Sequence, residues 1–223
     1  MDLHSIVNAE REFVAGETRV AQCPCIVAVN NLDDLARVPS RLRWFHPATI
    51  TPLSGAKGGA FVLACPSLST AALWVATEND YYRADYVTFL NQHYGMQMES
   101  IPAPWDVDHL YNRERARQYA LLYVRTALVE RGVNRSHGAS YEKDVTTNEA
   151  LRARPDMRLM DAVTSMKYFG FLAPLRSDPR ESEIEAYLAF AASKLGLDPD
   201  EERKSIALLR QKASTPWAAR RQG

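Results

Sequence analysis

The stretch that decides the fold is WDVDHLYNRERARQYALLYVRTALVERGVNRSHGASYEK, residues 105–143. It opens with a short extended run that ends in Asp108-His109. A β-strand is expected over 121–129, which is rich in Leu, Val, Tyr and Thr. Asn134 or Ser136 then caps a helix that runs through Tyr141, Glu142 and Val145. The order is a strand that ends in histidine, a second strand, and a helix that starts beside polar side chains.

The flanking sequence predicts an α+β fold. Short apolar runs bounded by Pro and Gly favour strands, and apolar residues spaced by three and four favour helices. The first hundred residues combine strands at 26–29 and 60–64 with helices at 32–38 and 80–94. The last third is helical, at 157–169, 181–195 and 199–212. We expect three parts: a mixed part of unknown role at 1–100, a ββα-metal-like core at 101–150, and a helical part at 151–223 packed on that core.

Composition excludes several classes of protein. The chain has 223 residues, of which 46% are hydrophobic and 24% charged, and its 27 basic and 27 acidic side chains cancel. These values are typical of a globular protein, and they argue against a disordered chain or a polycation that coats nucleic acid. No run approaches the roughly 20 apolar residues of a membrane-spanning helix, and no signal peptide is visible. We therefore expect a cytoplasmic protein without a membrane partner.

Two weaker motifs favour structural interpretations. Cys23, Cys25 and Cys65 with His46 lack the paired spacing of a zinc site, so we expect free thiols. The glycine-rich segment 54–59 lacks the Ser or Thr that follows the lysine of a phosphate-binding loop. It is better explained as a turn before the strand at 60–64.

The polar residues of the 105–143 stretch suit phosphodiester hydrolysis. That reaction needs an activated water and a cation beside the leaving oxygen. A neutral imidazole can take the proton of the water, which makes His109 the candidate base. Mg²⁺ prefers oxygen ligands, and Asn134 and Glu142 are candidates. The structural alternative is that His109 is a core histidine and Asn134 a turn residue.

The stretch resembles the His-Me finger endonucleases, also called ββα-metal or HNH-type nucleases. The resemblance covers about 40 residues, and the family's CxxC pairs and DRGH box are absent. It implies a divalent metal, Mg²⁺ or alternatively Zn²⁺ or Mn²⁺. The 25 residues from His109 to Asn134 and the eight to Glu142 resemble the non-specific DNA/RNA endonuclease branch. The Asp-His pair resembles the HNH branch, which makes Asp108 and His137 the alternative metal ligands.

Six arginines lie between residues 113 and 135. Arg113 and Arg135 are the candidates for contacting phosphate, because each lies close in sequence to a proposed site residue. The alternative is a solvated surface on which these arginines pair with acidic neighbours.

We therefore expect a metal-dependent endonuclease that hydrolyses DNA or RNA. Its resemblance to toxin domains of bacterial competition systems implies delivery by a secretion system and a cognate immunity protein. One rival is a binding or adaptor protein that uses its helical C-terminal third as the interface. The other is a hydrolase that uses Asp108 and His109 on a small substrate in a deep apolar pocket.

Overall fold

The computed structural model describes residues 2–41, 48–66, 69–138, 156–174 and 180–214. The strands are β1 (Ile26–Val29), β2 (Thr49–Pro52), β3 (Ala60–Cys65), β4 (Thr70–Ala76), β5 (Trp105–His109), β6 (Tyr123–Glu130) and β7 (Met157–Leu159). The helices are α1 (Leu3–Ala21), α2 (Leu32–Arg41), α3 (Tyr82–Tyr94), α4 (Arg113–Gln118), α5 (Arg131–Gly138), α6 (Ala162–Tyr168), α7 (Glu181–Phe190), the π-helical turn η3 (Ala191–Leu195) and α8 (Pro199–Ser214). The fold is α+β, as the sequence predicts.

One antiparallel sheet joins the described strands in the order β2-β3-β4-β6-β1-β7, and β5 also pairs with β6. Thr126 of β6 is opposite both Leu73 of β4 and His109 of β5. Since a strand has two edges, β4 and β5 flank opposite edges of β6. Strands from all three expected parts of the chain therefore share this sheet.

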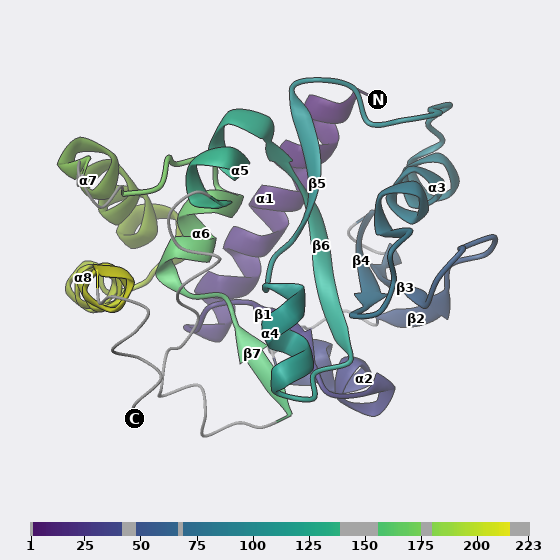
Figure 1. The fold of residues 1–223 in the computed structure, drawn as a ribbon, viewed down its shortest axis with the longest axis horizontal. Coiled ribbons are helices and arrows are strands. Elements are labelled where there is room, and N and C mark those ends of the chain that lie inside the picture. Colours follow the sequence, from purple (N-terminus) through teal and green to yellow (C-terminus); the bar gives the residue numbers. More distant parts are fainter. Residues whose placement is uncertain (1, 42–47, 67–68, 139–155, 175–179, 215–223) are drawn as a thin grey trace.

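Helices cover both faces of β4. Leu73 and Val75 join a buried cluster with residues of α1 and α3, whereas Ala72 and Trp74 join another with α2. This alternation arises because successive side chains of a β-strand point to opposite faces of the sheet. In Figure 1, α1 crosses the middle of the molecule, with α3 and β2–β4 on one side and α6, α7 and α8 on the other.

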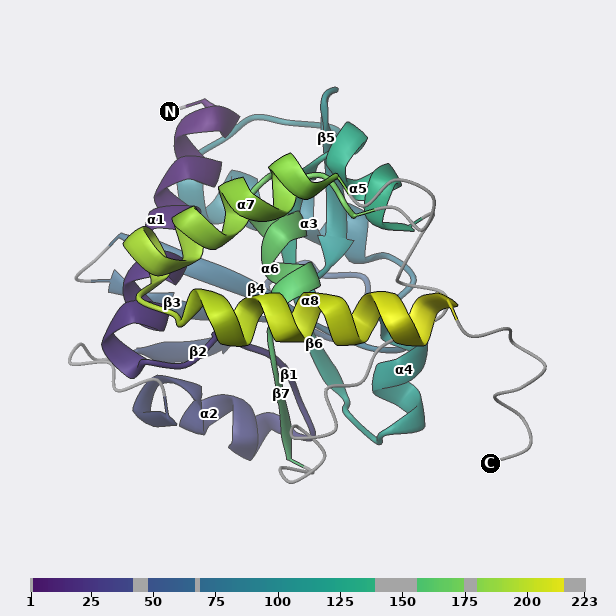
Figure 2. The same ribbon diagram turned by 90° about the vertical axis from the view of Figure 1, so that its left-hand side faces the viewer.

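Local signals explain where several helices begin and end. Asp2 caps α1 by accepting a hydrogen bond from the Ser5 N–H, and Asp161 caps α6 in the same way. Gly95 ends α3 in the left-handed conformation. Figure 2 shows α7 and α8 lying over α6, with α1 alongside. None of the described helices combines the length and apolar character needed to cross a membrane.

Two of the predicted helices, those expected after residue 134 and over 157–169, differ in the structure. The helix expected over 157–169 is instead the strand β7 followed by α6, because Asp161 starts the helix after Leu159. The helix α5 begins at Arg131, so Asn134 lies within it and does not cap it, and residues 139–145 of the expected helix lie outside the described residues.

Candidate functional site

The three elements of the decisive stretch follow one another as strand, strand and helix. The strands β5 and β6 pair antiparallel from Trp105 opposite Glu130 to His109 opposite Thr126. The helix α5 starts directly after β6 and packs against both strands. Because Trp105 is opposite Glu130, the first residues of β5 lie beside the start of α5.

The side chains of β5 divide between its two faces. Trp105 and Val107 lie in the buried cluster with α3, and the ring of His109 contacts Tyr82 at a centroid distance of 4.2 Å. Asp106 and Asp108 point to the opposite face. The imidazole of His109 and the amide of Asn134 on α5 are consequently on different faces of the same strand.

His109 is an uncharged histidine at neutral pH. Burial is the main reason that its pKa falls to about 4; the positive charges of Arg113, Lys167 and Arg83 also lower it, and Asp108 opposes the shift. Its Nε2 atom is buried and has no hydrogen-bond partner within the described ranges. Such an atom needs an explanation, because a buried polar group without a partner is costly.

Asp108 already has a cationic partner. Lys167 of α6 donates from Nζ to Asp108 Oδ2, and its side chain is only 4% exposed. The charges of Lys167 and Asp108 both affect the pKa of His137, with opposite signs. The Nε2 of His137 is hydrogen bonded to the Phe171 carbonyl at 2.9 Å, and burial lowers the pKa of this histidine to about 4.

Asn134 lies beside a different carboxylate. Its Nδ2 donates to Asp106 Oδ2 at 3.4 Å, and Arg131 Nε donates to Asp106 Oδ1 at 3.1 Å. Sequence reasoning missed Asp106, although its position two residues before Asp108 on an alternating strand could have indicated it. It also missed Lys167, which is 59 residues from Asp108 and carries no local signal.

The candidate arginines differ in their surroundings. Arg113 Nη1 donates to Asp80 Oδ1 at 2.7 Å and to the Asn79 carbonyl at 3.3 Å, close enough to His109 to affect its pKa. Arg135 is exposed on α5. The glycine-rich segment is a turn whose Lys57 and Gly58 N–H groups donate to the buried Asp85 carboxylate.

The donors do not converge on a place for a metal ion. Asp108 is bound by Lys167, His137 by a backbone carbonyl and Asn134 by Asp106, while Glu142 lies outside the described residues. Within the described residues, no three His, Cys, Asp or Glu side chains are grouped as metal ligands. The candidate donors within the described ranges, as they lie, therefore do not fit a divalent cation.

Comparison with family models, with curated proteins and with solved structures finds no match to this chain.

Proposed function

We propose that the chain cleaves phosphodiester bonds of RNA, with His109 as the proton acceptor. The observation that carries the proposal is an uncharged imidazole, with an unbonded Nε2, at the end of β5 and close to two arginines. Arg83 and Arg113 supply positive charge near the place where a phosphate would lie, whereas Lys167 is bound to Asp108 on the other face of β5. A bound phosphate adds negative charge, which raises the pKa of His109 and makes the imidazole a stronger base.

The arrangement favours RNA over DNA. Hydrolysis of DNA needs a separate attacking water that must be bound and activated. RNA carries its own nucleophile in the 2′-hydroxyl. In the proposed step, His109 takes the hydroxyl proton as the 2′-oxygen attacks phosphorus. The bond to the 5′-oxygen breaks, that oxygen takes a proton from solvent, and a 2′,3′-cyclic phosphate remains.

The proposal requires Tyr82 to move. The Tyr82 ring contacts the ring of His109. The Arg83 guanidinium lies over the same Tyr82 ring, 4.6 Å from its centroid. A phosphate that attracts Arg83 would compete with this cation–π contact. We therefore expect Tyr82→Ala to increase cleavage by exposing Nε2, provided that the variant remains folded.

The direct test uses matched RNA and DNA oligonucleotides, each incubated in EDTA and with Mg²⁺, Mn²⁺ or Zn²⁺. Wild-type protein should cut RNA to products with cyclic phosphate ends, and His109→Gln should lower the rate by about 100-fold or more. His93→Gln is the control, because this exposed histidine lies on the far part of α3. Equal rates for wild type and His109→Gln, or no cleavage in any condition, would contradict the proposal.

The resemblance to toxin domains adds a cellular expectation. Cleavage of RNA inside a producing cell would stop growth unless a partner protein neutralised the enzyme. Induced expression in a bacterium should therefore arrest growth, and His109→Gln should relieve the arrest at equal protein level. Growth arrest that persists with His109→Gln would separate toxicity from the proposed chemistry.

A further inference from the structure

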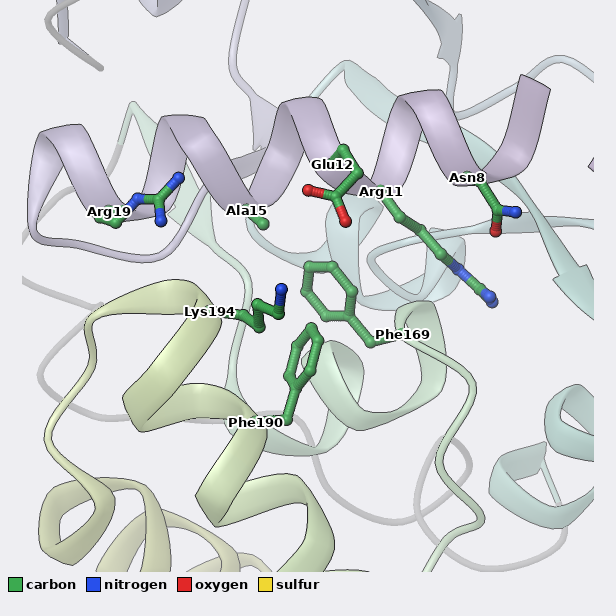
Figure 3. Close-up of a pocket in the computed structure, with 8 residues that line it drawn as sticks. All are labelled: Asn8, Arg11, Glu12, Ala15, Arg19, Phe169, Phe190 and Lys194. Atoms are coloured by element: carbon green, nitrogen blue, oxygen red, sulfur yellow. The ribbon is translucent and has the colours of Figure 1, made fainter. Parts of the chain in front are cut away.

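A separate pocket of about 510 Å³ lies between α1 and the segments that follow α6 and α7 (Figure 3). Its size is in the range of pockets that bind small molecules. The side chains that line it are Asn8, Arg11, Glu12, Ala15, Arg19, Phe169, Phe190 and Lys194. None of them belongs to β5, β6 or α5, so the pocket is distinct from the surroundings of His109.

Positive charge in this pocket is only partly neutralised. Arg11 is engaged, because its guanidinium donates to both carboxylate oxygens of Glu130, at 3.0 and 2.7 Å, and to the Tyr168 carbonyl. Arg19 and Lys194 are exposed and have no ion pair in the part of the chain that the structure describes. With Glu12 as the remaining acid, the lining carries a net positive charge that favours an anion.

Aromatic side chains form the apolar part of the same pocket. The rings of Phe169 and Phe190 are 4.8 Å apart between centroids and inclined by 51°. Both are only partly buried, while Ala15 beside them on α1 is 6% exposed. In Figure 3, α1 supplies one wall, and the two rings and Lys194 stand opposite it. A planar ring can pack here against aromatic and methyl surface.

Irregular backbone places Lys194 in this position. The helix α7 passes into the π-helical turn Ala191–Leu195, which ends at Gly196 in the left-handed conformation. A π-helical turn widens the helix by one residue and changes the direction of the side chains that follow. Such turns occur frequently at functional sites, and this one places Lys194 in the lining of the pocket.

We propose that this pocket binds an aromatic anion, a small molecule in which a planar ring is joined to a phosphate or a carboxylate. Arg19 and Lys194 receive the anionic group, and Phe169 and Phe190 contact the ring. Glu12 and Asn8 accept hydrogen bonds from hydroxyl or amino groups of the ligand. The proposal does not depend on the cleavage of RNA, since none of its residues surrounds His109.

Isothermal titration calorimetry of the full chain tests the proposal with five probes. Adenosine 5′-monophosphate and phenyl phosphate represent the phosphate source, and phenylpyruvate represents the carboxylate source. Inorganic phosphate has the anionic group without the ring, and adenosine has the ring without the anionic group. We expect at least one of the three aromatic anions to bind at least about tenfold more tightly than inorganic phosphate or adenosine. No binding of any aromatic anion, or equal binding of inorganic phosphate alone, would overturn the proposal.

Variants locate the binding. Arg19→Gln and Lys194→Gln should each weaken binding of the best probe by about tenfold, because each removes a charge-assisted hydrogen bond. Phe190→Leu should weaken binding of the aromatic probe and leave binding of inorganic phosphate unchanged. Lys204→Gln on α8 is the control, because this exposed lysine pairs with Glu201 away from the pocket. Unchanged affinity in the Arg19→Gln, Lys194→Gln double variant would place the ligand elsewhere and overturn the assignment.

Discussion

At the scale of single residues, Glu10 links the stability of the protein to pH. This carboxyl is 7% exposed, and burial raises its pKa from the ordinary value of 4.5 to about 7. The folded state therefore holds a proton between pH 4.5 and 7 that the unfolded state releases. The part of the free energy of unfolding that comes from this proton is fully present below pH 4.5. It is lost as the pH rises through 7, and the loss amounts to about 3 kcal/mol.

The substitution Glu10→Gln should remove this dependence, because an amide does not ionise. We expect the variant to unfold at higher urea concentration than wild type at pH 8, and at a similar concentration at pH 5. Glu12→Gln is the matched control, since Glu12 is an exposed glutamate on the same helix. An equal effect of Glu10→Gln at both pH values would contradict the assignment.

The buried pair of Arg125 and Glu17 is a second test at this scale. Arg125 Nη1 lies 3.5 Å from Glu17 Oε2, and both side chains are at most 6% exposed. Arg125→Met should lower the free energy of unfolding by about 3–5 kcal/mol, because it leaves a buried carboxylate without its cation. Adding Glu17→Gln should restore part of the loss. Arg203→Met, which breaks an exposed pair with Glu185, should cost less than about 1 kcal/mol in the same denaturation experiment.

At the scale of elements, the turn between β2 and β3 is fixed by its contact with α3. Asp85 accepts hydrogen bonds from the Lys57 and Gly58 N–H groups and from Asn79 Nδ2 at 2.8 Å. A methyl group added at Gly58 would lie 2.3 Å from Asn79 Cγ. Gly58→Ala should therefore destabilise the fold by about 1–3 kcal/mol in thermal or urea unfolding.

Glycine in α1 provides the opposite case. A Cβ at Gly16 would meet nothing within 4 Å, and the position is helical. Gly16→Ala should stabilise the protein by about 0.5–1 kcal/mol, because alanine loses less backbone entropy in a helix. Loss of stability in Gly16→Ala would contradict this prediction, and unchanged or higher stability in Gly58→Ala would show that contact with Asn79 does not require glycine at position 58.

Elements were predictable where their signals are local. The helix α3 has its apolar residues at helical spacing and ends at Gly95, and β6 is a run of β-formers. The π-helical turn at Ala191–Leu195 has no comparable signal. For the candidate site, the sequence predicted that His109 ends a strand, but it placed Asn134 at the cap of a helix, whereas Asn134 lies within α5. It did not reveal that His109 and Asn134 lie on opposite faces of β5, nor that Lys167 donates to Asp108, because both depend on tertiary packing.

At the scale of the whole molecule, the sheet ties distant parts of the chain together. The strand β1 pairs with β6 on one edge and with β7 on the other, so residues near 27, 124 and 158 lie on neighbouring strands. The C-terminal helices are joined to this assembly through α6, which contacts both β6 and α8. The hydrogen bond of Tyr187 Oη to Glu202 Oε2, at 2.6 Å, further links α7 to α8.

This connectivity predicts one cooperative unfolding unit across the sheet. Hydrogen exchange followed by mass spectrometry should give the backbone amides of β1, β4, β6 and β7 the same free energy of opening, because none of these strands can leave without exposing its neighbours. The ends of α8 should exchange faster, since a terminal helix frays before the sheet opens. Addition of urea should lower the opening energies of the four strands in parallel. A markedly lower opening energy for β7 and α6 than for β1 and β6 would instead show that residues after 156 unfold as a separate unit.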